Sequence, residues 1–236
     1  MPISLDALGP DGGPIYAETN FSNFIVEPLN ASSALIFIAI SMYWLWKIRN
    51  EKLQFGFIFF SMSLMLIGGI GGTIYHAFRV SKYYLLMDWL PITIITIFCS
   101  VYFLNKIFHK LFLSALVVAL SLFIQYLIWD YAGKHDHHHS ITLNYLLLGF
   151  SILFPLVVYG YLQNWRHFKL VIYSLICFGF ALFFRLIDAY EIFPFGTHFL
   201  WHTGGAAATW LMVDFMYLEN DKFVKELNQI KWDIDL

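Results

Sequence analysis

The sequence predicts an all-α membrane protein, a bundle of seven transmembrane helices with the N-terminus outside and the C-terminus in the cytoplasm. Three observations predict it: the composition, the length of the apolar segments and the placement of Lys and Arg. Of the 236 residues, 59% are hydrophobic, 20% are aromatic and only 13% are charged, which is far from the composition of an ordinary soluble domain. The net charge of −2 gives no field that would favour nucleic acid.

Seven apolar segments follow one another, each of about 18–23 residues and so able to cross a hydrocarbon core about 30 Å thick. We place them near residues 30–48, 54–75, 84–104, 110–130, 141–163, 168–187 and 198–217. The connections are short and no repeat is evident, so we expect one membrane domain.

We expect that domain to occupy residues 30–217, between an extramembrane N-terminal segment (1–29) and a cytoplasmic tail (218–236). The N-terminal segment has neither the basic n-region nor the apolar h-region of a cleaved signal peptide. The tail mixes charged residues with spaced apolar ones, which predicts a short amphipathic helix lying at the surface.

The positions of Lys and Arg orient the bundle. Seven crossings put the two termini on opposite sides of the membrane. The residues on the C-terminal side are Lys47, Arg49, Lys52, Lys106, Lys110, Arg166, Lys169, Lys222, Lys225 and Lys231. Those on the N-terminal side are Arg79, Lys82, Lys134 and Arg185. Because cytoplasmic loops carry the excess of Lys and Arg, the C-terminus is expected in the cytoplasm and the N-terminus in the periplasm or lumen.

Two histidines open the seventh segment. His198 and His202 are four residues apart, so on a helix they share one face with Cβ atoms about 5–6 Å apart. That spacing suits joint capture of one metal ion. The alternative is that both imidazoles simply lie at the wet membrane interface, and a third ligand would decide between the two.

Counting the crossings supplies that third ligand. His76 ends the second segment and Asp88 lies near the start of the third, so both share a leaflet with His198 and His202. Ionisable residues at membrane depth usually face the bundle interior or a wet cavity. Three imidazoles with an open position form a catalytic zinc arrangement. Asp88 could then take a proton from water, or it could orient a histidine or cap a helix.

Other polar residues in the membrane body have simpler interpretations. Arg185 and Asp188 are spaced i, i+3 and can pair with each other on one helix face, while Asp188 is also a candidate to support a metal ligand from behind. Asp214 lies about four turns into the seventh segment, near the opposite leaflet and outside the expected site. Cys99 and Cys177 fall within apolar runs, where they behave as small hydrophobic residues.

Oxygen-bearing side chains gather before the first segment. Glu18, Asn20 and Glu27 are of the kind that hard cations such as calcium prefer. An equally good interpretation is an interfacial lead-in, in which Asn30 or Ser32 caps the first helix.

A histidine tract, KHDHHH at residues 134–139, follows the fourth segment. Closely spaced histidines on a flexible loop bind metals weakly and without catalytic geometry. We interpret the tract as a solvated loop.

Four motifs in this order resemble those of the alkaline ceramidases. They are GGTIYH (71–76), LMDWLP (86–91), FRLID (184–188) and HFLWH (198–202). The alkaline ceramidases belong to a superfamily of seven-helix membrane hydrolases that includes the progestin and adiponectin receptors. The resemblance covers residues 18–205, nearly the whole expected membrane body.

The resemblance implies an activity and its cofactors. It implies hydrolysis of the amide of ceramide, a membrane lipid, to sphingosine and a fatty acid, with Asp88 assisting the attacking water. The implied zinc ligands are His76, His198 and His202, and the implied calcium ligands are Glu18, Asn20 and Glu27.

The chain departs from the family pattern at two positions. Ile15 stands where the family has an aspartate in the calcium site, and Gly72 stands where it has a serine four residues before the first zinc histidine. Thr73 or Tyr75 could supply a hydroxyl for the oxyanion, although neighbouring residues of a helix point in other directions.

Two other classes of function fit parts of the pattern. A non-catalytic lipid receptor or sensor would keep the metal in a structural role. An ion or proton transporter would need ionisable residues distributed across the membrane, and here Asp214 is the main one outside the cluster.

Overall fold

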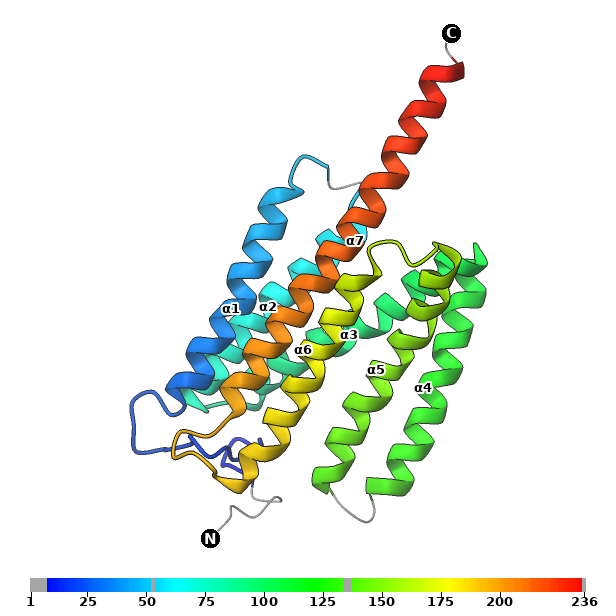
Figure 1. The fold of residues 1–236 in the computed structure, drawn as a ribbon. Helices are drawn as coiled ribbons and strands as arrows, with labels where there is room; N and C mark the ends of the chain where they lie inside the picture. Colours follow the sequence, from blue (N-terminus) through cyan, green and yellow to red (C-terminus); the bar gives the residue numbers. More distant parts are fainter. Residues whose placement is uncertain (1–7, 52–53, 134–136, 235–236) are drawn as a thin grey trace.

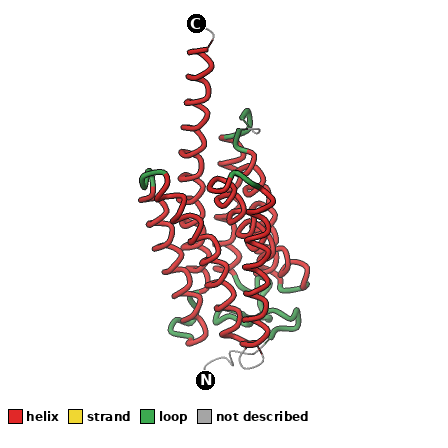
Figure 2. Tube along the Cα trace, turned by 90° about the vertical axis from the view of Figure 1, so that its right-hand side faces the viewer, coloured by secondary structure: helices red, strands yellow, loops and turns green. Residues whose placement is uncertain are grey.

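The computed structural model describes residues 8–51, 54–133 and 137–234. Over these ranges the chain is all-helical (Figures 1 and 2), and its β contact is an isolated bridge between Leu8 and Pro14. The helices are Pro28–Lys47 (α1), Gly56–Phe78 (α2), Lys82–Phe108 (α3), Leu111–Gly133 (α4), His137–Leu162 (α5), Phe168–Ile187 (α6), the 3₁₀ helix Asp188–Tyr190 (η1) and His198–Ile234 (α7). Residues 1–7 of the N-terminal segment, 134–136 of the histidine tract and 235–236 of the tail lie outside the described ranges.

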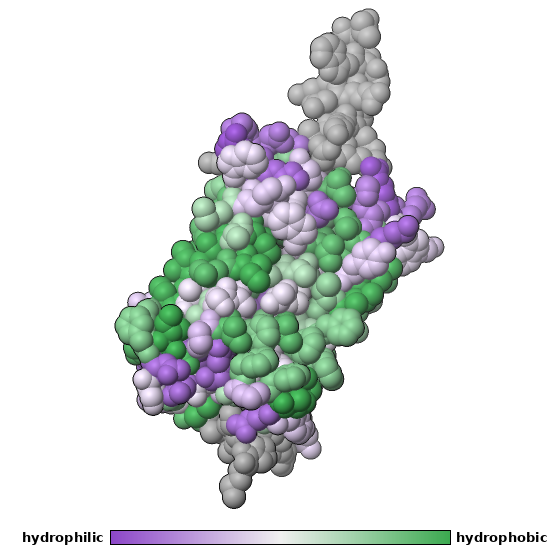
Figure 3. Space-filling model, turned by 60° about the vertical axis from the view of Figure 1, so that its left-hand side comes forward, coloured by the Kyte–Doolittle hydropathy of each residue, from purple (hydrophilic) through white to green (hydrophobic). Residues whose placement is uncertain are grey.

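Five of these segments are long and apolar enough to cross a membrane, which indicates an integral membrane protein. They are Pro28–Lys47, Gly56–Phe78, Lys82–Phe108, Leu111–Ile128 and Phe168–Tyr190. The described part of α5 adds a shorter apolar stretch, Gly149–Leu162. On the face shown in Figure 3, hydrophobic residues cover the middle of the molecule and hydrophilic residues gather toward its two ends.

The last helix differs from the sequence-based prediction. We expected a membrane segment followed by a separate surface helix, but α7 runs unbroken from His198 to Ile234 and extends beyond its neighbours (Figure 1). The physical reason is the absence of a breaker, because neither Gly nor Pro occurs after Gly205. The tail therefore continues the helix that carries two of the candidate ligands.

Helix α2 lies between α1 and α3, and α7 packs against both α1 and α6. Helices α4 and α5 join the bundle through α3. Short connections make neighbouring helices antiparallel, so α2 ends, and α3 and α7 begin, at the end of the bundle where the N-terminal segment lies (Figure 1).

Close packing around α2 depends on small residues. A Cβ at Gly69 would lie 3.0 Å from the backbone nitrogen of Ile38 on α1, and one at Gly68 would lie 3.4 Å from Cβ of Pro91 on α3. Backbones that approach this closely are typical of membrane helix interfaces, where packing rather than the hydrophobic effect drives association. The middle of α2 is thereby held between two neighbouring helices.

An aromatic core fills the opposite end of the bundle. Trp44, Phe55, Phe103 and Phe215 are fully buried there, and the Phe55 ring stacks on Tyr217 with centroids 4.8 Å apart. Such aromatic pairs add about 0.5–1.5 kcal/mol beyond area burial. This core fixes the helices at the end away from the histidines.

Candidate metal centre

Three histidines meet at the N-terminal end of the bundle. His76 lies in the last turn of α2, while His198 and His202 lie in the first two turns of α7. All three are at least 96% buried, and their candidate ligand atoms lie within 4.8 Å of one another. Among the described residues, this is the group of His, Cys, Asp and Glu that could hold a metal ion. The predicted grouping of the three imidazoles is therefore present in the structure.

Some ring nitrogens of the three histidines are hydrogen-bonded, and others have no hydrogen-bond partner. Nδ1 of His76 donates to the Glu27 carboxylate at 2.5 Å, and Nδ1 of His202 lies 2.9 Å from Ser33 Oγ and 3.1 Å from the carbonyl oxygen of Asn30. Within the described ranges, Nε2 of His76 and Nδ1 of His198 are buried without a hydrogen-bond partner. In metal sites, the ring nitrogen that does not bind the metal is usually hydrogen-bonded to such a carboxylate or carbonyl group.

This arrangement fits a bound metal. Buried polar atoms normally find a partner, so two buried, unpaired nitrogens beside a third imidazole are explained if an ion completes them. Three imidazoles suit zinc, and they also suit copper, iron or nickel. The donor set therefore supports a transition-metal site without choosing the metal.

Asp188 fixes the start of α7 by accepting backbone hydrogen bonds. Its Oδ1 accepts hydrogen bonds from the backbone N–H groups of Thr197 at 2.5 Å and His198 at 2.9 Å. Its Oδ2 accepts one from Ala17 at 3.1 Å. The Arg185 guanidinium lies 5.7 Å from the Trp201 ring centroid. Asp188 thus sets the position of His198 through the backbone and fastens the N-terminal segment to α7.

Asp88 faces the last turns of α2 from α3. A Cβ placed at Gly72 would collide with Oδ1 of Asp88 and lie 3.3 Å from its Cγ, so the carboxylate lies directly against this glycine. Gly72 is one turn before His76, so the two positions lie on one face of α2. Asp88 and His202 also line the same cavity. The structure therefore brings Asp88 to the cluster, in the space that a side chain at position 72 would need.

The two hydroxyls considered as substitutes for a serine at position 72 lie elsewhere. Thr73 Oγ1 donates to the carbonyl oxygen of Gly69 at 2.8 Å, within its own helix. Tyr75 is fully buried and its hydroxyl lies against Gly13 of the N-terminal segment. Thr73 and Tyr75 are therefore structural residues of α2 in this arrangement.

Sequence reasoning missed Tyr16. Its ring stacks on that of His198 with centroids 3.8 Å apart and lies 5.5 Å from that of His76. Its electrostatic neighbours include Arg185 and Asp88. Burial raises the pKa of Tyr16 above its usual value, so the phenol stays protonated and can donate a hydrogen bond. No sequence signal placed this loop residue, because its position depends on how the N-terminal segment folds over the bundle.

The three predicted calcium ligands have other partners. Glu18 accepts hydrogen bonds from the backbone N–H groups of Leu29 at 2.5 Å and Asn30 at 2.9 Å, and so caps α1. Asn20 is exposed and its Oδ1 accepts from the N–H of Ser22 at 3.0 Å. Burial raises the pKa of Glu18 above its usual value.

Glu27, the third of them, is fully buried. It accepts hydrogen bonds from Thr19 Oγ1 at 2.5 Å and from Arg79 Nη1 at 2.5 Å, besides the one from His76. Burial opposes its ionisation, but the hydrogen bond and charge of His76, followed by the charge of Arg79, hold the pKa of Glu27 below its usual value. Glu27 is therefore a supporting residue of the histidine cluster.

An apolar cavity of about 250 Å³ extends from the cluster into the bundle. Asp88 and His202 line it at one end, and Phe57 and Met216 line it at the other. The residues between come from α1, α2, α3, α5, α6 and α7. Trp201 and Met216 both line it, and fifteen residues of α-helix separate them, which is a length of about 22 Å.

Comparison with known proteins adds no assignment to this geometry. Neither the protein-family models nor the curated proteins searched contain a match to the chain.

Proposed function

We propose that this protein is a zinc-dependent membrane hydrolase that cleaves the amide bond of an N-acyl lipid, most simply a ceramide. The observation that carries the proposal is the position of the three-histidine cluster at one end of an apolar cavity, with Asp88 lining the same cavity. The ordered resemblance to the alkaline ceramidases supports the choice of an amide. The cavity supports a lipid.

The residues divide the chemistry among them. His76, His198 and His202 would hold the zinc, which would lower the pKa of a water molecule and polarise a carbonyl. Asp88 accepts a proton from the attacking water and returns it to the amine leaving group. Tyr16, stacked on His198, donates a hydrogen bond to the acyl oxygen as negative charge develops there. Tyr16 thereby takes the role that a hydroxyl at position 72 would have.

The cavity supports a long acyl chain as the apolar part of the substrate. Its polar groups lie at the cluster end, and methionine and aromatic side chains such as Met212, Met216 and Phe57 line the rest. An extended chain in it places its carbonyl near His202 and Asp88 and its terminal methyl about 22 Å away, near Met216. Mostly apolar walls with a few convergent polar groups are the usual form of such sites.

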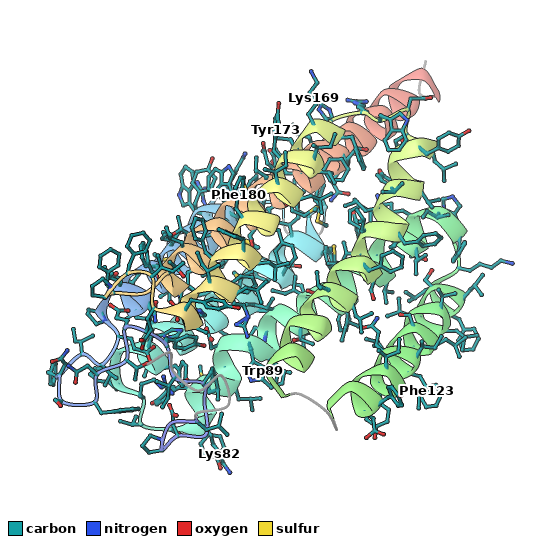
Figure 4. All side chains as sticks on the ribbon, turned by 60° about the horizontal axis from the view of Figure 1, so that its bottom comes forward. Lys82, Trp89, Phe123, Lys169, Tyr173 and Phe180 are labelled. Atoms are coloured by element: carbon teal, nitrogen blue, oxygen red, sulfur yellow. The ribbon has the colours of Figure 1, made fainter. Side chains whose placement is uncertain are left out.

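In the proposed topology all seven α-helices cross the membrane, with the N-terminus and the metal centre on the outer side. Lys82 and Lys169 lie at opposite ends of the bundle (Figure 4), and the Lys and Arg residues are more numerous at the end of Lys169. The exposed side chains of Phe123 and Phe180 lie on the intervening lengths of α4 and α6. The positive-inside rule then puts the C-terminus in the cytoplasm.

The proposal is tested with purified protein in detergent. We expect release of free fatty acid from a panel of N-acyl lipids, loss of the activity on chelation and its return with zinc. His198→Gln keeps a polar side chain of similar size but removes the imidazole, and we expect it to lose activity. His109→Gln, at an exposed site at the other end of the bundle, is the matched control and should behave as the wild type.

A lipid sensor with a structural metal is the second candidate, and Gly72 is the observation that favours it. The glycine removes the hydroxyl that the resemblance places beside the first histidine. A protein that binds N-acyl lipid and retains its metal, but releases no fatty acid from any member of the panel, would be a sensor. That result would contradict the hydrolase proposal.

A further inference from the structure

We infer that the positive charge of Arg79 takes the place of a calcium ion in the N-terminal segment. Through its contact with Glu27, Arg79 also positions His76. This inference rests on the proposed metal centre but not on hydrolysis. It assigns a role to a buried arginine that the reaction does not use, and it replaces the calcium site expected from Glu18, Asn20 and Glu27.

Arg79 is buried to an extent that is unusual for its type. It follows the last residue of α2, three positions after His76, in the left-handed conformation with φ of 51°. The residue is 96% buried and its side chain is wholly so. Arginine is almost never fully buried unless it is paired. The question is therefore which groups pair with it.

Two carboxylates and a carbonyl surround the guanidinium. Nε and Nη2 donate to the two oxygens of Asp11 at 2.6 and 2.9 Å, which is a bidentate pair. Nη1 donates to Oε1 of Glu27 at 2.5 Å, and Nη2 also donates to the carbonyl oxygen of Gly13 at 3.3 Å. The ring centroid of Tyr75 lies 4.7 Å from the guanidinium carbon, within cation–π range.

These contacts form a continuous chain to the candidate metal ligand. Asp11 holds Arg79, Arg79 holds one oxygen of Glu27, and the other oxygen of Glu27 accepts from Nδ1 of His76 at 2.5 Å. The backbone adds two bonds to the same place, from Val26 N–H to the Ala77 oxygen at 2.8 Å and from Glu27 N–H to the His76 oxygen at 3.1 Å. The N-terminal segment is therefore bound directly behind His76.

The consequence for His76 is a fixed tautomer and ring orientation. With Nδ1 donating to Glu27, the Nε2 lone pair is left for a metal, which is the usual carboxylate–histidine support. A carboxylate this deeply buried is costly unless its charge is balanced. Arg79 supplies that balance at 2.5 Å. A bound calcium ion on Glu27 would supply the same charge, so the two cations are alternatives.

The oxygens present do not fit calcium as well as arginine. Calcium takes six to eight oxygen ligands, but both oxygens of Glu27 already accept hydrogen bonds and both oxygens of Glu18 cap α1. Ile15 offers no side-chain oxygen. A divalent ion on Glu27 would also lie next to the Arg79 charge. The structure thus fills the position with a side chain that cannot dissociate.

The test measures metal binding without any lipid. Wild-type protein, stripped of metal in detergent, is titrated with cobalt, whose d–d absorption reports the ligand geometry, and its thermal unfolding is followed with millimolar calcium or with a calcium chelator. We expect wild-type protein to bind cobalt and to unfold at the same temperature with or without calcium. Arg79→Gln should bind cobalt about 10–100-fold more weakly, the usual effect of losing such support.

Arg79→Lys separates positioning from simple structural support. Lysine keeps the charge but cannot make the bidentate pair, so we expect recovered stability with an altered cobalt spectrum. Arg49→Gln, at an exposed arginine that donates to the Trp46 carbonyl oxygen, is the matched control and should leave both readouts unchanged. If Arg79→Gln does not fold, Asp11→Asn weakens the same chain from its outer end and should reduce cobalt affinity several-fold.

Two results would overturn the inference. One is calcium binding to wild-type protein that raises the unfolding temperature and is abolished by Glu27→Gln. The other is wild-type cobalt affinity and spectrum in the Arg79 variants. Neither result depends on turnover. A protein whose cobalt affinity depends on Arg79, but which cleaves no lipid, would leave this inference standing while the hydrolase proposal fails.

Discussion

The same helices carry a linked polar network at one end of the bundle and an aromatic core at the other. At the N-terminal end, buried Asp11, Arg79, Glu27 and His76 are joined by contacts of 2.5–2.9 Å. At the opposite end the largest buried side chain is Trp44, packed among other rings. The difference separates two tasks, because the aromatic end can fix the helices while the polar end holds groups ready for a ligand.

The comparison also shows where unpaired atoms are tolerated. At the polar end, Glu27 and Arg79 satisfy each other, and the buried nitrogens without partners among the described residues belong to the histidines that would bind metal. At the aromatic end, the buried Glu219 accepts a hydrogen bond from Tyr159 at 3.0 Å, and Trp44 Nε1 has no partner there. The polar end is therefore distinguished by two unpaired nitrogens that belong to one group of candidate metal ligands, although Asn30 Oδ1 and the Tyr75 hydroxyl are also unpaired there among the described residues.

The largest expected effect comes from a substitution that changes only the polar end of the bundle. Asp88→Asn keeps the volume against Gly72 but removes the proposed proton acceptor, so fatty-acid release should fall by about 10²–10⁴-fold. Metal content and unfolding temperature should stay near those of the wild type, since Asp88 is not among the three candidate ligands. Turnover of N-acyl lipid measured beside zinc content checks this. Full activity in the variant would remove Asp88 from the mechanism.

A change at the aromatic end should have the opposite signature. Trp44→Ala removes a wholly buried indole and should lower the free energy of unfolding by about 3–5 kcal/mol, measured by denaturant titration in detergent. Zinc affinity per folded molecule should be retained, because Trp44 packs on Tyr43, Trp210 and Tyr217, whereas the rings beside the histidines are those of Tyr16, Phe37 and Tyr75. A loss of metal affinity with little loss of stability would show that the two ends are coupled.

Tyr16→Phe sharpens the assignment of roles within the polar end. The ring can still stack on His198, but the hydroxyl is gone, and loss of one donor to a developing oxyanion typically lowers kcat about 10²–10³-fold. We expect kcat to fall with little change in KM or zinc content. An effect on metal content instead of kcat would make Tyr16 a packing residue.

The smallest expected effect concerns pH and Asp11. Burial opposes ionisation of this carboxyl, but the hydrogen bond and charge of Arg79 outweigh it and hold the pKa of Asp11 below its usual value of 3.8. A group whose folded pKa is depressed stabilises the folded state above its unfolded pKa and loses that contribution as the pH falls through the folded one.

Wild-type protein should accordingly be more stable than Asp11→Asn above about pH 4, and the two should converge as the pH is lowered further. Unfolding temperatures across this range, in one detergent, measure the difference. A gap between the two proteins that persists unchanged into strong acid would show that Asp11 contributes through something other than its charge.

The helices were predictable because apolar runs of membrane length are visible in the sequence. Six of the seven predicted segments agree with the structural helices to within a few residues at most boundaries, and the seventh begins at His198 as predicted. The structure continues that helix to Ile234, since charged residues after Tyr217 do not by themselves stop a helix. The meeting of His76 with His198 and His202 followed from counting crossings, which needs no side-chain detail.

What the sequence could not show lies in the loops. Tyr16, Asp11 and Arg79 acquire their roles from how the N-terminal segment folds across the ends of α2 and α7, and no periodicity encodes that path. The hydroxyls of Thr73 and Tyr75 were placed by residue type alone, whereas backbone hydrogen bonding and packing against Gly13 direct them elsewhere.

The central claim is that His76, His198 and His202 hold one metal ion, and the most direct measurement is the metal content of the purified protein. We predict one zinc per chain in the wild type and in His109→Gln, and essentially none in a variant with all three histidines replaced by Gln that still folds. A wild-type protein purified without chelators that carries no transition metal, or a triple variant that keeps its zinc, would contradict the claim.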